Sequence, residues 1–154
     1  RQSSETGDCM QIHDDIFEWE GWGGLLRLAS GRCRLRIYDL RKGAGVAHLK
    51  PIIVVIQDVP GSPMSIRSCT SHIATRVTQE FGIDPNRMLF VEYNPEVLYG
   101  QNNQNVVPER LDQVVFTWHA DRAVQPRWRP LASPLRDLLK GLLGAEPGTP
   151  TETP

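Results

Sequence analysis

The sequence predicts an α+β fold in which an N-terminal antiparallel three-stranded meander continues into a mixed β-sheet, with one long amphipathic helix on a sheet face and a short C-terminal helix. Three observations lead to this prediction. Apolar and charged residues alternate through residues 16–38, as they do in half-buried strands. An apolar run, a helical stripe and a second apolar run follow one another, as in a βαβ unit. Leucines recur at helical spacing near the C-terminus.

The meander is predicted from three short runs of period two, joined by turns at residues 21–24 and at Ser30-Gly31. With these turns, a single register places every apolar residue on one face and every charged residue on the other. A slip of one residue would destroy this agreement, so the register is well specified. The inward residues are Phe17, Trp19, Leu26, Leu28, Cys33, Leu35 and Ile37.

The βαβ unit begins with Ile52–Ile56, whose continuous β-branched character predicts a central strand covered on both faces. Apolar spacings of three and four then predict a helix over about residues 65–81, which ends at Gly82. Met88–Val91 is the second strand, and a right-handed crossover makes it parallel to the first. With the meander, the predicted core contains Ile53, Val55, Ile66, Ile73, Val77, Phe81, Leu89, Val91 and Val115.

The C-terminal third adds less regular elements. Asn94–Arg110 is predicted to be a long polar loop, and irregular loops of this length are usually functional or mobile. Val114–Trp118 is a strand, and Gln125–Leu131 is an edge strand because its prolines leave few donors for a ladder. Ser133 begins a short helix over about residues 133–143, which is expected to close one end of the fold.

A length of 154 residues fits one ordinary domain. We predict a flexible N-terminal segment over residues 1–12, a single α+β domain over 13–144, and a disordered tail over 145–154, whose three prolines accompany no large apolar side chain. No apolar run approaches the ~20 residues of a membrane span. Three cysteines without metal-type spacing are typical of a reducing compartment, so we expect a cytoplasmic location.

The start of the long helix is the first candidate site. Ligands of sheets with parallel strands tend to bind beyond the carboxyl ends of the strands, and a helix N-terminus there offers free N–H groups to an anion. Two carboxylates in such a crevice can hold a divalent cation or act as acid and base. Against this, the segment lacks a phosphate-loop or dinucleotide glycine pattern, and capping is the structural alternative. The candidate anion-binding residues are Asp58, Ser62, Ser65, Arg67, Glu92 and Asn94.

An arginine-rich face of the meander is the second candidate. Guanidinium groups match phosphate oxygens, so the face predicts a nucleic-acid or partner surface. The alternative, which we favour, is that Glu18 and Glu20 neutralise it from the neighbouring strand. Trp128 suits either stacking on a base or partner, or a cation–π contact at the sheet edge. The residues of this second candidate are Arg27, Arg32, Arg34, Arg36 and Trp128.

The sequence contains no recognisable catalytic or metal-binding motif. Cys69 and His72 are helical neighbours, but Cys69 belongs to the apolar stripe, where a thiol is inert. No histidine or cysteine has zinc-type spacing, so we predict no metal site, and no cofactor is indicated. The net charge of −1 gives no general attraction to nucleic acid.

Two functions remain open. The favoured one is a non-catalytic binding or regulatory module that recognises an anionic ligand or a protein partner; nucleic acid is not favoured and no membrane is expected. The alternative is a small enzyme that acts on a phosphorylated or nucleic-acid substrate at the start of the long helix. Convergence of Asp58, Arg67 and Glu92 on one concave pocket would favour the enzyme.

Overall fold

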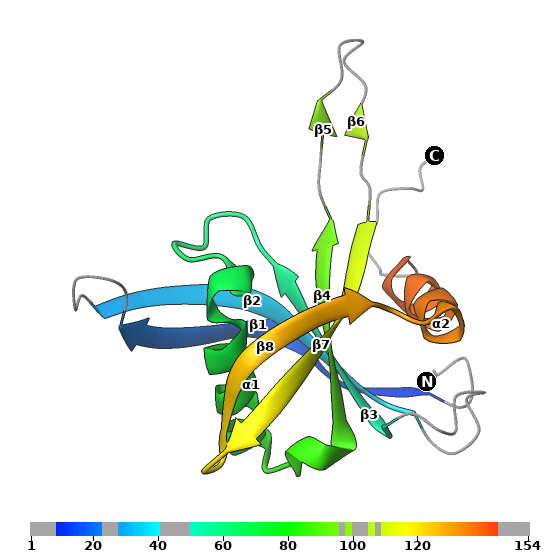
Figure 1. The fold of residues 1–154 in the computed structure, drawn as a ribbon. Helices are drawn as coiled ribbons and strands as arrows, with labels where there is room; N and C mark the ends of the chain where they lie inside the picture. Colours follow the sequence, from blue (N-terminus) through cyan, green and yellow to red (C-terminus); the bar gives the residue numbers. More distant parts are fainter. Residues whose placement is uncertain are drawn as a thin grey trace.

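The computed structural model describes residues 9–22, 28–40, 50–95, 98–99, 105–106 and 109–144, and it contains a six-stranded sheet in the order β1-β2-β3-β4-β7-β8 (Figure 1). The strands are β1 (Met10–Trp22), β2 (Leu28–Asp39), β3 (Ile52–Asp58), β4 (Met88–Pro95), β7 (Glu109–His119) and β8 (Arg122–Pro130). β3 and β4 are parallel, as predicted, and the other neighbouring pairs are antiparallel. The mixed sheet and the α+β class are confirmed.

The N-terminal meander is confirmed as β1-β2-β3, but its strands differ from the predicted ones. β2 runs without a break through Ser30 and Gly31, so the predicted turn there and the register that depended on it are wrong, and β3 is the third strand of the meander. Gly31 faces Trp19 across the ladder, and a Cβ built on it would lie 2.8 Å from Cη2 of the indole and closer still to Cζ2. This glycine therefore makes room for an aromatic ring rather than a turn.

The predicted face of the meander is correct for the side chains that the structure describes. Phe17 pairs with Cys33 in the β1–β2 register, and Leu35 pairs with Ile56 between β2 and β3. The buried members of the predicted set are Phe17, Trp19, Cys33, Leu35 and Ile37. Leu26 and the side chain of Leu28 lie outside the described residues. β1 begins at Met10, three residues before the predicted start of the domain.

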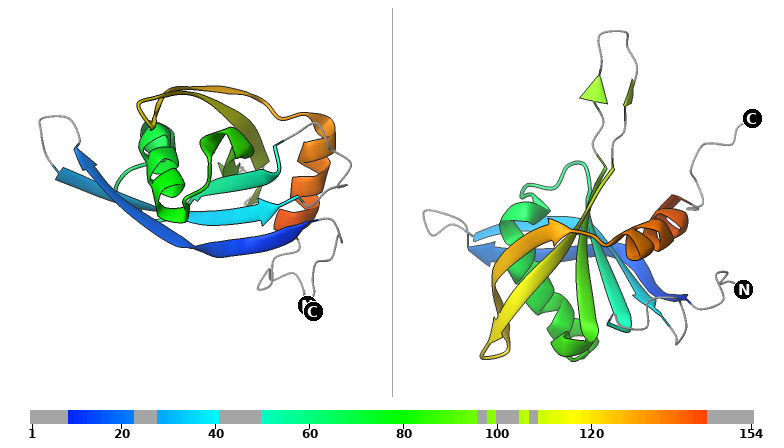
Figure 2. Two further views of the ribbon diagram at one scale, coloured as in Figure 1. Left: turned by 90° about the horizontal axis from the view of Figure 1, so that it is seen from below. Right: turned by 45° about the vertical axis from the view of Figure 1, so that its right-hand side comes forward.

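The long helix α1 (Ile66–Phe81) packs on one face of the sheet. It ends at Gly82, whose φ of 62° is the left-handed conformation of a helix C-cap. The sheet curls so that β8 returns over α1 (Figure 2). There the Ser71 hydroxyl donates to the carbonyl of Ala123, and the Ala123 N–H donates to Oγ1 of Thr75 at 3.0 Å.

The C-terminal helix α2 (Ser133–Gly144) packs on the opposite face of the sheet rather than closing an end. Along β3, Ile52, Val54 and Ile56 face α1, whereas Ile53 and Val55 face α2. The predicted single core is therefore two cores that share the sheet, with Leu89 and Val91 of β4 on the α2 side. Val115, predicted to be core, is half-buried, and its neighbour Val114 is buried instead.

The segment predicted as a polar loop is partly β-structure. β4 continues to Pro95 and β7 begins at Glu109, because these two strands pair along their polar extensions. Between them the short strands β5 (Leu98–Tyr99) and β6 (Asn105–Val106) pair antiparallel, beyond the end of the main sheet (Figure 1). Residues 145–154, the predicted tail, lie outside the described residues. No helix within the described ranges has the length and apolar character to cross a membrane.

Candidate functional site

The start of α1 is held by side chains that the sequence singled out as an anion site. Asp58, at the end of β3, accepts the backbone N–H of Ile66 on Oδ1 at 3.1 Å. Ser62 Oγ accepts the N–H of Arg32 at 3.0 Å and donates to the carbonyl of Met64 at 2.7 Å. Ser65 is the N-cap residue without a capping bond from its side chain, and its hydroxyl lies 3.3 Å from Oγ of Ser68. The geometry of Asp58 and Ser62 is that of capping and loop closure.

Arg67, Glu92 and Asn94 do come together, because the βαβ crossover places the first turn of α1 over β4. Glu92 has none of its surface exposed, and its Oε1 lies 2.8 Å from Nη2 of Arg67 and 3.2 Å from Nδ2 of Asn94. Its Oε2 lies 3.2 Å from the Thr70 hydroxyl, which also makes a shorter bond of 2.7 Å to the Ile66 carbonyl. The Arg67 guanidinium and the Asn94 amide therefore pair with this buried carboxylate, as burial of a charge requires.

Asp112 of β7 completes the cluster and was not expected from the sequence. It is the cross-strand partner of Glu92, so two carboxylates would repel one another across the ladder. Arg67 bridges them, with Nη2 3.2 Å from Oδ2 of Asp112, and Arg110 Nη2 lies 3.0 Å from the same oxygen. Charges alternate along this network of two arginines and two carboxylates. Finding Asp112 from sequence would have required the register between β4 and β7.

Trp128 stacks on the outer side of this network. The Arg67 guanidinium carbon lies 4.3 Å from the centre of the indole ring, which is a cation–π contact between α1 and β8. The tryptophan thus meets a cation from α1 rather than either of its neighbouring arginines in the chain. Its Nε1 is buried without a hydrogen-bond partner among the described residues.

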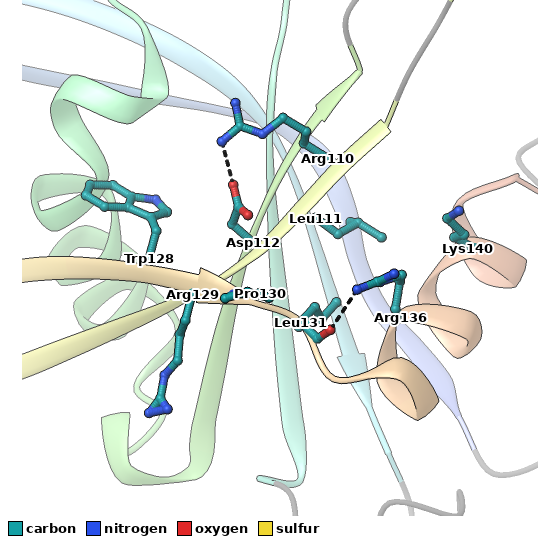
Figure 3. A pocket seen from close by; sticks show the side chains of 9 residues that line it. All are labelled: Arg110, Leu111, Asp112, Trp128, Arg129, Pro130, Leu131, Arg136 and Lys140. Atoms are coloured by element: carbon teal, nitrogen blue, oxygen red, sulfur yellow. Dashed lines mark hydrogen bonds and ion pairs between the residues drawn. The ribbon is translucent and has the colours of Figure 1, made fainter.

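A pocket of about 460 Å³ opens beside Trp128, between the ends of β7 and β8 and the helix α2 (Figure 3). We call it the basic pocket; Arg110, Leu111, Asp112, Trp128, Arg129, Pro130, Leu131, Arg136 and Lys140 line it. Figure 3 shows Arg136 and Lys140 rising from successive turns of α2, and Arg136 Nη2 donates to the Leu131 carbonyl at 3.2 Å.

The charges of the basic pocket are unbalanced. Its single carboxylate, Asp112, is already bonded to two arginines. No carboxylate of the described residues forms an ion pair with Arg129, Arg136 or Lys140. Arg136 and Lys140 lie on the polar side of α2, a helix that the leucine spacing predicted. They were not predicted as site residues, because helical periodicity does not indicate which strands the polar side contacts.

Two further pockets have a different character. One, of about 480 Å³, is lined by Glu18, Glu20, Arg32 and Arg76, so that both signs of charge are present. The other, of about 130 Å³, is lined largely by apolar and aromatic side chains around Phe90. Lys50 is the one charged residue that lines this pocket, so the pocket beside Trp128 has the largest excess of positive charge of the three.

The arginine face is not a cluster of free cations. Arg34 holds Asp14 with two bonds, Nε to Oδ1 at 2.9 Å and Nη2 to Oδ2 at 2.8 Å, and this contact lowers the pKa of the Asp14 carboxyl. Arg36 is only 2% exposed and donates to Oε1 of Gln57. Arg32 is exposed, and Arg27 lies outside the described residues. Asp14, which was not singled out in the sequence, is thus an acidic partner of Arg34.

The cysteine–histidine pair on α1 has no activated thiol, because burial raises the pKa of Cys69. Within the described ranges no three histidine, cysteine or acidic side chains are grouped as a metal site would require. Comparisons with protein families, with curated proteins and with solved structures found no match to this chain.

Proposed function

We propose that this protein is a non-catalytic binding module that takes a small anionic ligand in the basic pocket. One observation carries the proposal: Arg129, Arg136 and Lys140 line the pocket without ion-pair partners among the described residues, whereas its only carboxylate is already bonded to two arginines. Cations gathered in a concave site attract an anion and release it as salt screens them.

The other walls of the pocket suit an organic phosphate. The planar guanidinium of Arg136 is held by the Leu131 carbonyl, so part of its donor set is fixed before a ligand arrives. Leu111, Leu131 and Pro130 supply apolar surface beside the cations. Most small-molecule sites combine such apolar walls with a few placed polar groups. Phosphate supplies the charge and an attached organic group fills the apolar part.

The residues predicted at the start of α1 support binding more than catalysis. Asp58 hydrogen-bonds to the helix N-terminus, and the buried Glu92 is bonded to Arg67 and Asn94. A general acid or base must reach a substrate proton, which Glu92 cannot do without breaking these bonds. Arg67 contributes indirectly, by holding Trp128 at the rim of the pocket.

The test is a titration of the isotope-labelled protein with inorganic pyrophosphate, followed by backbone amide shifts. We expect saturable shifts at Leu131, Arg136 and Lys140, and weaker binding at higher salt. The variant carrying Arg136→Gln and Lys140→Gln should bind at least roughly tenfold more weakly, since each charged hydrogen bond contributes about 1.5–3 kcal/mol.

The matched control removes two exposed cations elsewhere, by Arg87→Gln with Arg122→Gln, and should bind within a factor of about two of the wild type. Equal weakening by both double variants would mean that only net charge matters, which would contradict a defined pocket. Shifts at Ser65 and Asn94 in place of Arg136 would move the site to the start of α1 and revive the enzyme alternative.

A further inference from the structure

The strand β1 forms one margin of the sheet. It is the longest strand of the described sheet, with 13 residues, and it pairs with β2 on one side while no described strand pairs with its other side. An unpaired margin presents a row of free N–H and C=O groups, which is a template for another strand.

The opposite margin, β8, is protected in ways that β1 is not. The N–H and C=O of Ala123 bond to the side chains of Thr75 and Ser71 on α1. Pro126 and Pro130 have no N–H to offer. β1 contains no proline. The two edge strands of the sheet therefore differ in their capacity to pair with a further strand.

The exposed large apolar side chains of the described residues all lie on β1. Met10 is 38% exposed, and Ile12 and Ile16 are each 47% exposed. Scattered apolar residues on a surface need no explanation, but a group along one open strand is typical of an interaction site. These side chains give a docking segment apolar contacts in addition to backbone hydrogen bonds.

The backbone of β1 is oriented for such a contact. The N–H of Ile16 donates to Oδ1 of Asp15 at 2.7 Å, so it points away from the ladder with β2. Because strand residues alternate, the N–H groups of Asp14 and Glu18 point the same way. Asp15 covers one outward donor with a local bond, which an incoming carbonyl can replace.

The charge of β1 selects the partner. Asp15, Glu18 and Glu20 are exposed, and the described residues form no ion pair with them. Opposite charges across a strand pair stabilise it and like charges destabilise it. A second copy pairing antiparallel about Ile16 would set Asp14 opposite Glu18, which disfavours self-association. An extended segment with basic residues suits this margin instead.

We propose that β1 is a docking strand, to which a basic, extended segment of a partner protein adds as a further strand of the sheet. Main-chain hydrogen bonds supply affinity in this mode, and alternate side chains supply specificity. Ile12 and Ile16 receive apolar side chains of the segment, and the carboxylates of Asp15, Glu18 and Glu20 receive its lysines or arginines.

The probe is a short fluorescent peptide with blocked ends, in which a valine and lysines share one face so that they lie opposite Ile16, Glu18 and Glu20; it is compared with the same peptide carrying glutamate in place of lysine. We expect the wild-type protein to bind the basic peptide, by fluorescence anisotropy, and not the acidic one. Amide shifts in the labelled protein should follow Asp14, Ile16 and Glu18. Binding that leaves these amides unmoved, or equal binding of both peptides, would overturn the proposal.

Three variants separate the contributions of the backbone, the apolar side chain and the charges to binding. Ile16→Pro removes an outward N–H without breaking the ladder and should weaken binding at least roughly tenfold, whereas Ile16→Ala should weaken it less. Circular dichroism confirms the fold of each. Reversal of Asp15, Glu18 and Glu20 to lysine should transfer binding to the acidic peptide. Retained preference for the basic peptide, or a dimer that Ile16→Pro dissociates in sedimentation, would reject a basic partner.

Discussion

Asp14 shows what the sequence did not reveal at the level of single residues. It was not singled out, although its period-two position places it on the same face as the arginines of β2, where it pairs with Arg34. The burial of Arg36 did not follow from the pattern, because alternation assigns a face but not what covers that face. The proximity of Arg67, Glu92 and Asn94 could be predicted because all three lie within one contiguous βαβ unit. The position of Asp112 depends on the pairing of β4 with β7, which lies further along the chain.

The ion pair of Asp14 gives a prediction about pH. The hydrogen bond from Arg34 lowers the pKa of Asp14 below its ordinary 3.8, so the folded state binds this proton more weakly than the unfolded state. The resulting stability is present above the unfolded pKa and is lost as the pH falls through the lowered, folded pKa. Asp14→Asn should therefore lower the free energy of unfolding by up to about 1 kcal/mol at neutral pH, which is the usual contribution of an exposed ion pair. In strong acid the substitution should leave the free energy of unfolding unchanged.

Urea denaturation of wild type and Asp14→Asn across the acid range measures this difference. Asp121→Asn is the control, because Asp121 is an exposed turn residue with a φ of 63° and no ion pair in the described part of the chain. A stability difference for Asp14→Asn that persists unchanged into strong acid would show that the ion pair is not its cause.

Among the elements, the βαβ unit was predictable, whereas the turn between the first strands and the placement of distant elements were not. The parallel β3–β4 pair and α1 follow from one contiguous segment, so apolar periodicity and connection rules were sufficient. The side of the sheet that α2 covers depends on the route of β7 and β8, which no local pattern encodes. At Ser30-Gly31 the composition is that of a turn, and tertiary packing with Trp19 overrides it.

Gly31 tests this account of β2. A methyl group at this position would overlap the indole of Trp19, so Gly31→Ala should lose roughly 1–3 kcal/mol of unfolding free energy through overpacking. Gly141→Ala on α2 is the control, since a Cβ there meets nothing within 4 Å. It should gain about 0.5–1 kcal/mol, because alanine favours the helix. Denaturant titration measures both, and a neutral Gly31→Ala would contradict the close approach.

At the scale of the whole molecule, one sheet serves two cores. The continuous apolar run Ile52–Ile56 predicted a strand covered on both faces, yet a helix was predicted for only one face of the sheet. With α2 on the second face, the apolar runs are fully accounted for. The same arrangement brings Arg136 and Lys140 beside β7 and β8, so the basic pocket is a consequence of the topology.

The shared sheet predicts a single cooperative unit. Ile73 of α1 and Leu139 of α2 are fully buried on opposite faces, so Ile73→Ala and Leu139→Ala should each lose roughly 2–5 kcal/mol through lost burial and a cavity. Because both cores rest on the same strands, each variant should shift the whole transition. Circular dichroism and tryptophan fluorescence should therefore give coincident urea curves, as two-state unfolding requires. If Leu139→Ala displaced only one of the two curves, α2 and its face would be a separate unit, attached to a sheet that α1 alone maintains.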